Sequence, residues 1–138
     1  MAGDSSTRKF TDMDANRLRE SMARFEGVCV VATVNPDGTP DASIFMPAMP
    51  DDGHVILILA DNRTRANIER TGKARLVYDV PNPHAEEKAQ RHAGARMDLS
   101  LVRPEGESAE EFQQVAQSFP RMNPAVVILR IERLLPVG

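Results

Sequence analysis

Tryptophan is absent from this sequence, and cysteine and tyrosine each occur once. A single cysteine excludes an intrachain disulfide, which fits a reducing compartment. Cys29 lies within the apolar segment 28–31, so we interpret it as a small core residue rather than a nucleophile. No apolar segment approaches the length of about 20 residues that a membrane-spanning helix needs, and the N-terminus lacks the pattern of a secretory signal. We therefore expect a cytoplasmic protein without a membrane partner.

Neither sign of charge is in large excess. The chain has 17 Lys and Arg residues against 20 Asp and Glu residues, a net charge of −3. This balance predicts no broad basic surface, so we expect no nucleic-acid partner, and any phosphate site must be local. The 138 residues are enough for one hydrophobic core. We expect a flexible tail over residues 1–10 and a single domain over residues 11–138.

Short apolar segments separated by turn residues predict six strands, at 28–34, 39–46, 54–60, 74–80, 94–103 and 125–135. Periodic apolar residues predict helices at 11–26, 63–70 and 108–119, and residues 81–92 are interpreted as an exposed loop or a short surface helix. Most of the strands are joined by tight turns, with few β-α-β alternations. We therefore expect a mainly β fold with peripheral helices, built on a six-stranded antiparallel barrel.

The segment 60–70 follows a predicted strand and begins a short helix, for which Asn62 is a candidate N-cap. The free N–H groups and the positive end of a helix favour a phosphate, which the Arg63 guanidinium and the Thr64 hydroxyl can also contact. An alternative that fits this segment equally well is a basic helix start that faces solvent. Arg70, near the other end of the helix, is expected to point away from the helix start.

Other patterns indicate no specific chemistry. His84 and His92 are eight residues apart beside two glutamates, a spacing that matches no tetrahedral or facial metal site, so we expect surface histidines and no metal. The chain has neither a Gly-x-Gly-x-x-Gly motif nor a Walker loop, which excludes the two best-known nucleotide-binding loops. The order of the residues supports no Ser-His-Asp arrangement and no carboxylate pair. The sequence therefore predicts no particular catalytic residue.

Three segments occur in an order and at a spacing that resemble a known family. They are VVATVNPDGTPDAS at 30–43, NRTRANI at 62–68 and GKARLVY at 72–78. Together they resemble the FMN-binding split barrels related to pyridoxamine 5′-phosphate oxidase, whose last strand is similar to AVVILRI at 125–131. Within that family, the chain is most similar to the small FMN-binding proteins of sulfate-reducing bacteria. The likeness covers about residues 25–135.

The resemblance implies a split β-barrel that binds FMN without a covalent bond, in a groove between the two subunits of a homodimer. A flat apolar slot with a few amide groups at its edge suits the isoalloxazine ring. The site residues that the resemblance implies are Asn62, Arg63 and Thr64 at the phosphate, Ser43, Ile44 and Phe45 against the ring and the ribityl chain, and Ile58, Leu59 and Ala60 with backbone contacts to the ring.

The chain also departs from the oxidases. Their C-terminal segment has a Trp and paired arginines that hold the vitamin phosphate, and this chain has no Trp. Segment 43–45 lacks the basic residue that the oxidases have there. We therefore expect an FMN-dependent oxidoreductase that passes electrons between a reduced donor and a small acceptor, without pyridoxamine 5′-phosphate oxidase activity. The alternatives are an electron carrier that exchanges electrons with a redox partner protein, or a flavin-free relative with another ligand in the groove.

Overall fold

The structure is a computed structural model in which residues 14–16, 18–19 and 27–137 are described. They include seven strands, two nine-residue α-helices and two short 3-10 helices. The strands are β1 (Cys29–Val34), β2 (Pro40–Phe45), β3 (Ala48–Asp51), β4 (His54–Ile58), β5 (Lys73–Tyr78), β6 (Ala95–Val102) and β7 (Val126–Leu135). The helices are α3 (Arg63–Thr71), α4 (Ala109–Gln117), η1 (Lys88–Gln90) and η2 (Gly106–Ser108).

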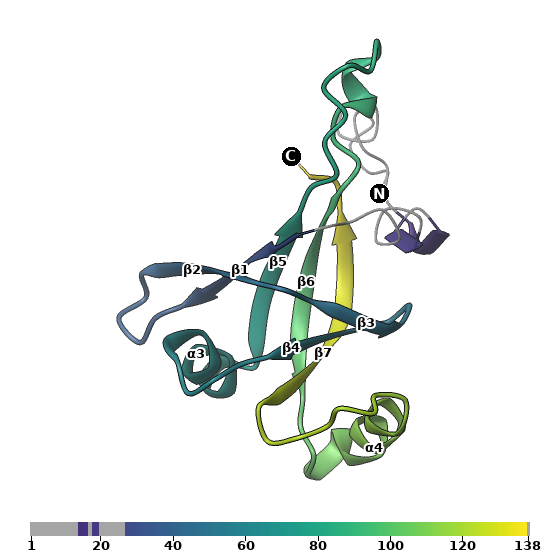
Figure 1. The fold of residues 1–138 in the computed structure, drawn as a ribbon. Coiled ribbons are helices and arrows are strands. Elements are labelled where there is room, and N and C mark those ends of the chain that lie inside the picture. Colours follow the sequence, from purple (N-terminus) through teal and green to yellow (C-terminus); the bar gives the residue numbers. More distant parts are fainter. Residues whose placement is uncertain (1–13, 17, 20–26, 138) are drawn as a thin grey trace.

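All these strands form one antiparallel sheet in the order β2-β1-β5-β6-β7-β4-β3. The sheet curls into a half barrel, in which β2 and β3 form a band that crosses the long strands (Figure 1). Helix α3 lies under the β1–β2 hairpin, and α4 lies at the lower ends of β6 and β7 (Figure 1). The expectation of a mainly β, split-barrel-like fold with peripheral helices is confirmed.

The prediction of six strands was wrong by one, because it missed β3. Pro47 and Pro50 suggested that the chain leaves the sheet after β2. Proline has no N–H to donate to a neighbouring strand. It is tolerated on an edge strand, because one side of that strand has no neighbour that needs this hydrogen bond. Strand β3 is such an edge, since among the described strands it pairs only with β4, and its register is irregular between Ala48 and Asp51. The bounds of the other six strands agree with the prediction to within about two residues.

The predicted tail at 1–10, and most of the helix predicted at 11–26, lie outside the described residues, so the division at residue 11 stays a prediction. Leu18, which is described, is helical and only 1% exposed. Among the described helices, none is long and apolar enough to cross a lipid bilayer.

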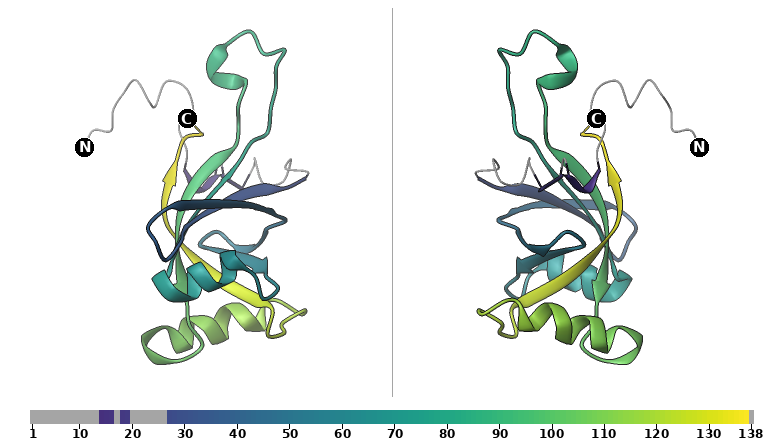
Figure 2. Two further views of the ribbon diagram at one scale, coloured as in Figure 1. Left: turned by 90° about the vertical axis from the view of Figure 1, so that its left-hand side faces the viewer. Right: turned by 90° about the vertical axis from the view of Figure 1, so that its right-hand side faces the viewer.

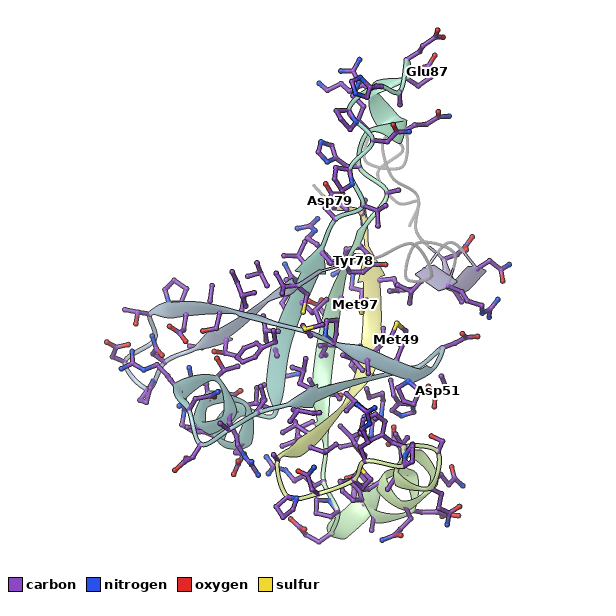
Figure 3. All side chains as sticks on the ribbon, viewed as in Figure 1. Met49, Asp51, Tyr78, Asp79, Glu87 and Met97 are labelled. Atoms are coloured by element: carbon purple, nitrogen blue, oxygen red, sulfur yellow. The ribbon has the colours of Figure 1, made fainter. Side chains whose placement is uncertain are left out.

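The main hydrophobic core lies on the inner face of the curled sheet, where Tyr78 and Met97 are buried (Figure 3). Cys29 belongs to this core, and burial raises the pKa of its thiol to about 11, which confirms its interpretation as a core residue. Neighbouring residues on a strand point to opposite faces. Val115 of α4 packs against the opposite face of the sheet, where Ile128 of β7 is fully buried.

The connection between β5 and β6 projects from the barrel as an arm (Figure 2). Its two sides approach so closely at Gly94 that a Cβ there would lie 1.9 Å from the Tyr78 carbonyl oxygen, so only glycine fits. His92 Nδ1 lies 2.6 Å from Asp79 Oδ2 at the base of the arm, and Glu87 lies near its tip (Figure 3). The predicted exposed loop is confirmed, and it includes the short helix η1.

Candidate cofactor site

Helix α3 begins at the residues that the sequence analysis assigns to a phosphate. Asn62 caps it, because its Oδ1 accepts a hydrogen bond from the Arg65 N–H at 2.9 Å. Gly72 ends the helix in the left-handed conformation at a φ of 73°. The Asn62 cap is as predicted. The first N–H groups of such a helix have no intrahelical acceptor, so they can bind an anion.

An open pocket of about 630 Å³ lies between the start of α3 and the β1–β2 turn. One wall is the turn at residues 35–39, and the other is the face of α3 that carries Arg63, Ala66, Asn67 and Arg70. The volume is within the range of about 300–1,000 Å³ that is typical of small-molecule sites. The pocket can therefore hold part or all of a ligand of cofactor size.

The charges around this pocket are balanced, since Arg63 and Arg70 face Asp37 and Asp61. Asp37 is held in place, because its Oδ1 accepts from the Thr39 hydroxyl at 2.6 Å and from the Thr39 N–H at 3.0 Å. These bonds, with a smaller contribution from Arg63, lower the pKa of Asp37. Within the described residues, the Arg63 guanidinium has no hydrogen bond or ion pair. Arg63 is therefore a cation that can bind a ligand.

Two side chains of α3 differ from the expectation. Thr64 is only 2% exposed and does not line the pocket, although its N–H remains at the helix start. Arg70 was expected to point away from the helix start, and this was wrong, because it lines the same pocket as Arg63. Residues seven apart are separated by about two helical turns and share a face. Arg65 is already engaged, since it donates to the carbonyls of Leu59 and Pro124 at 3.0 and 2.7 Å.

The residues predicted to contact the ring do not line this pocket within the single chain. Ile44 and Ile58 are exposed by 63% and 54%, whereas the half-buried Phe45 packs against the main core. Leu59 is fully buried, its N–H donates to the Ala125 carbonyl at 2.8 Å, and its own carbonyl accepts from Arg65. The predicted ring residues that do not line the pocket are Ser43, Ile44, Phe45, Ile58, Leu59 and Ala60.

A model of the pyridoxamine 5′-phosphate oxidase family matches residues 18–134 of the sequence. The chain belongs to this family. No curated protein sequence matches it. Membership agrees with the resemblance carried by the segments at 30–43, 62–68 and 72–78, two of which form walls of the pocket.

Solved structures that are similar to this family member share its fold. An FMN-binding protein from Syntrophomonas wolfei subsp. wolfei is 17% identical, with a TM-score of 0.61 and coverage of 97% of this chain and 90% of that one. HupZ from group A Streptococcus is 23% identical, with a TM-score of 0.58 and coverage of 91% and 100%. The heme storage protein HutZ from Vibrio cholerae is 18% identical, with a TM-score of 0.50 and coverage of 91% and 92%. At these identities the likeness establishes the fold and not the ligand.

The family member also has an apolar outer surface on the β1–β2 hairpin, here named the outer ribbon. Its members are the exposed apolar residues Val28, Val30, Val34, Ile44 and Met46. Val30 pairs directly with Ile44 across the two strands, so their side chains lie on one face. Met46 is 73% exposed and Ile44 63%, and within the described residues no element packs over them. Contiguous exposed apolar surface is typical of protein contacts.

A charged cluster away from the pocket joins α4 to the sheet. His54 lies between two carboxylates, with Nδ1 2.8 Å from Asp51 Oδ1 and Nε2 2.6 Å from Glu111 Oε2. Arg130 forms a two-bond ion pair with Glu111. Burial lowers the pKa of His54, but the hydrogen bonds to Glu111 and Asp51 outweigh it and raise this pKa overall. The Arg130 guanidinium is the main cause that lowers the pKa of Glu111 to about 2.

We expect Glu111→Gln to lower the free energy of unfolding at pH 7 by about 1 kcal/mol, a value reduced for solvent screening because Arg130 is part-exposed. The pKa of Glu111 in the folded protein lies below its usual value of 4.5. The ionised Glu111 carboxylate therefore stabilises the fold fully above pH 4.5, and this contribution is lost as the pH falls toward 2. Thermal unfolding between pH 2 and pH 7 measures the difference. The control is Glu110→Gln at the exposed neighbouring residue, and an equal loss in both variants at pH 7 would contradict the assignment.

Proposed function

We propose that this protein is an FMN-binding flavoprotein that acts as an oxidoreductase and is a homodimer. The observation that carries the proposal is the pocket at the start of α3, which has an arginine with no hydrogen bond or ion pair among the described residues and lies at the family's phosphate segment. Family membership and an FMN-binding structural neighbour agree with this ligand.

The phosphate end of FMN fits the residues at the helix start. A dianionic phosphate needs N–H donors and a cation, and the start of α3 supplies the N–H groups of Arg63 and Thr64 together with the Arg63 guanidinium. Asn62 is the N-cap of α3, and its bond to the Arg65 N–H holds the first turn in the conformation in which these groups point outward. We therefore assign the phosphate to Asn62, Arg63 and Thr64, with Thr64 acting through its backbone because its side chain is buried.

The isoalloxazine ring requires apolar walls that the pocket of one chain does not supply. The exposed Ile44 and Ile58, with Ser43, Phe45 and Ala60 beside them in sequence, are the remaining candidates for that end of the cofactor. The apolar outer ribbon includes Ile44 and provides the surface on which a second subunit can pack. In the proposed dimer, the partner covers the ring while α3 of the first subunit holds the phosphate.

When bound, FMN supplies the ability to accept and release electrons. In the proposed dimer, the residues at the start of α3 would hold the phosphate, and the partner subunit would cover the ring. An electron carrier would use the same site with a redox partner protein in place of a small substrate. Reduction of the bound flavin by NADH or NADPH under anaerobic conditions supports the enzyme, and reduction only by a protein donor supports the carrier.

Heme is the rival ligand, because two structural neighbours are described as a heme binding protein and a heme storage protein. The geometry that favours it is the 62% exposed side chain of His92, which Asp79 orients at 2.6 Å. This pair lies at the base of the arm and does not line the pocket at α3. A Soret shift on adding hemin that His92→Ala abolishes, without any FMN binding, would replace FMN by heme in the proposal.

The proposal is tested by titrating the purified protein with FMN and with riboflavin, which lacks the phosphate, and following flavin fluorescence. Because bonds to a charged group contribute about 1.5–3 kcal/mol each, we expect riboflavin to bind at least about tenfold more weakly than FMN. Equal affinities for the two flavins would contradict the assignment of the phosphate to α3. Absence of binding by either flavin would contradict the proposed function itself.

A further inference from the structure

The two walls of the candidate cofactor pocket are joined by hydrogen bonds from two side chains of α3. Asn67 Nδ2 donates to Thr33 Oγ1 and to Asn35 Oδ1, both at 3.0 Å. Arg70 Nη1 donates to Asn67 Oδ1 at 2.8 Å, and its Nη2 donates to the Val34 carbonyl. The helix is thereby bonded to the end of β1 and to the first residue of the β1–β2 turn.

The bond from Asn67 to Thr33 is buried, whereas the bond from Asn67 to Asn35 and those of Arg70 are part-buried or exposed. Asn67 is 1% exposed and Thr33 is 5% exposed. A buried amide that loses its partners is costly, because the chain must then bury an unpaired polar group. Any displacement of α3 relative to β1 would break the bonds, so they hold the helix and the turn at one separation.

We infer that Asn67, assisted by Arg70, is a positioning residue of the cofactor site, one that sets the distance between the β1–β2 turn and the start of α3. The identity of the ligand in this inference rests on the proposed function. Asn67 follows Arg63 by four residues and Arg70 follows it by seven, so the three share one helix face. A movement of that face relative to the turn would displace the Arg63 guanidinium and the first N–H groups together, and would thus misplace the phosphate donors.

Thr33 separates this positioning role from direct contact with the ligand, because Thr33 does not line the pocket and is bonded to Asn67. Thr33→Val keeps the shape of the side chain and removes the acceptor, whereas Thr33→Ser keeps the hydroxyl. We expect Thr33→Val to weaken FMN binding about fivefold and Asn67→Ala about tenfold, the range that follows from the loss of one or more neutral hydrogen bonds. Riboflavin affinity should change less than about twofold in both variants, and Thr33→Ser should retain most of the FMN affinity.

A second measurement follows the walls themselves in the protein without FMN. The turn is closed by bonds from the Gly38 N–H to the Asn35 carbonyl at 2.9 Å and from the Asn35 N–H to the Thr39 carbonyl at 2.9 Å. Hydrogen exchange of these amides should be about tenfold faster in Asn67→Ala, faster to a smaller degree in Thr33→Val, and close to wild type in Thr33→Ser. The amides of α4 serve as the internal control and should be unchanged.

The outcomes separate this inference from the proposed function. Faster hydrogen exchange in the turn of Asn67→Ala and Thr33→Val, together with a loss of affinity for FMN but not for riboflavin, supports the positioning role. Unchanged exchange in Asn67→Ala, or an equal loss of FMN and riboflavin affinity in that variant, overturns it. If the wild-type protein binds both flavins equally, the phosphate assignment fails, and the exchange rates still decide whether Asn67 holds the two walls.

Discussion

Replacing Ile44 by glutamate is expected to convert the protein into a monomer that no longer retains FMN. Ile44 is 63% exposed and lies beside Val30 in the outer ribbon, the surface proposed to contact the second subunit. A buried charge without a partner costs about 3–5 kcal/mol, and a two-fold interface contains the substituted residue twice. Sedimentation velocity measures the mass, and the visible absorbance of the sedimenting species shows whether flavin remains bound.

The control for this variant is Gln114→Glu, which adds the same charge at an exposed residue of α4, away from the outer ribbon. This variant should sediment as a dimer with FMN bound. If Ile44→Glu also remains a flavin-loaded dimer, the subunits meet elsewhere. If the wild-type protein is a flavin-loaded monomer, the requirement for a second subunit is contradicted.

Arg63→Ala is expected to weaken FMN binding about 10- to 150-fold, which corresponds to about 1.5–3 kcal/mol. Within the described residues the Arg63 guanidinium has no hydrogen bond or ion pair, so its removal should cost little folding stability and should act on the ligand. Riboflavin has no phosphate, so its affinity should change little. Fluorescence titration of both flavins against wild type and variant measures the two effects.

Arg121→Ala is the matched control, because Arg121 is exposed in the loop after α4 and does not line the pocket. Its effect on FMN affinity should stay under about 0.5 kcal/mol, the scale of an ordinary surface substitution. Arg70 does not serve as the control, since it lines the pocket and bonds to Asn67. A loss in Arg121→Ala as large as that in Arg63→Ala would indicate general electrostatic attraction in place of a phosphate site.

Local chemistry explains why much of the fold could be predicted. Alternating or continuous apolar residues determine six of the strands, and Pro36 with Gly38 determines the β1–β2 turn, where Gly38 has a φ of 88°. The Asn62 cap depends on a bond to a residue only three positions away. The shared face of Arg63 and Arg70, which both line the pocket, also follows from their seven-residue spacing on one helix.

The sequence by itself therefore determined six of the described strands, the β1–β2 turn, the Asn62 cap and the family segments, because each depends on residues close together in the chain. Only the tertiary structure revealed that β3 is an edge strand that tolerates Pro50, and that Thr64 faces inward. Only the tertiary structure shows that Asn67 is hydrogen-bonded to Thr33, which lies 34 residues earlier in the chain. Such pairings depend on how the curled sheet places α3 beside β1. Periodicity and spacing carry no information about contacts between segments so far apart.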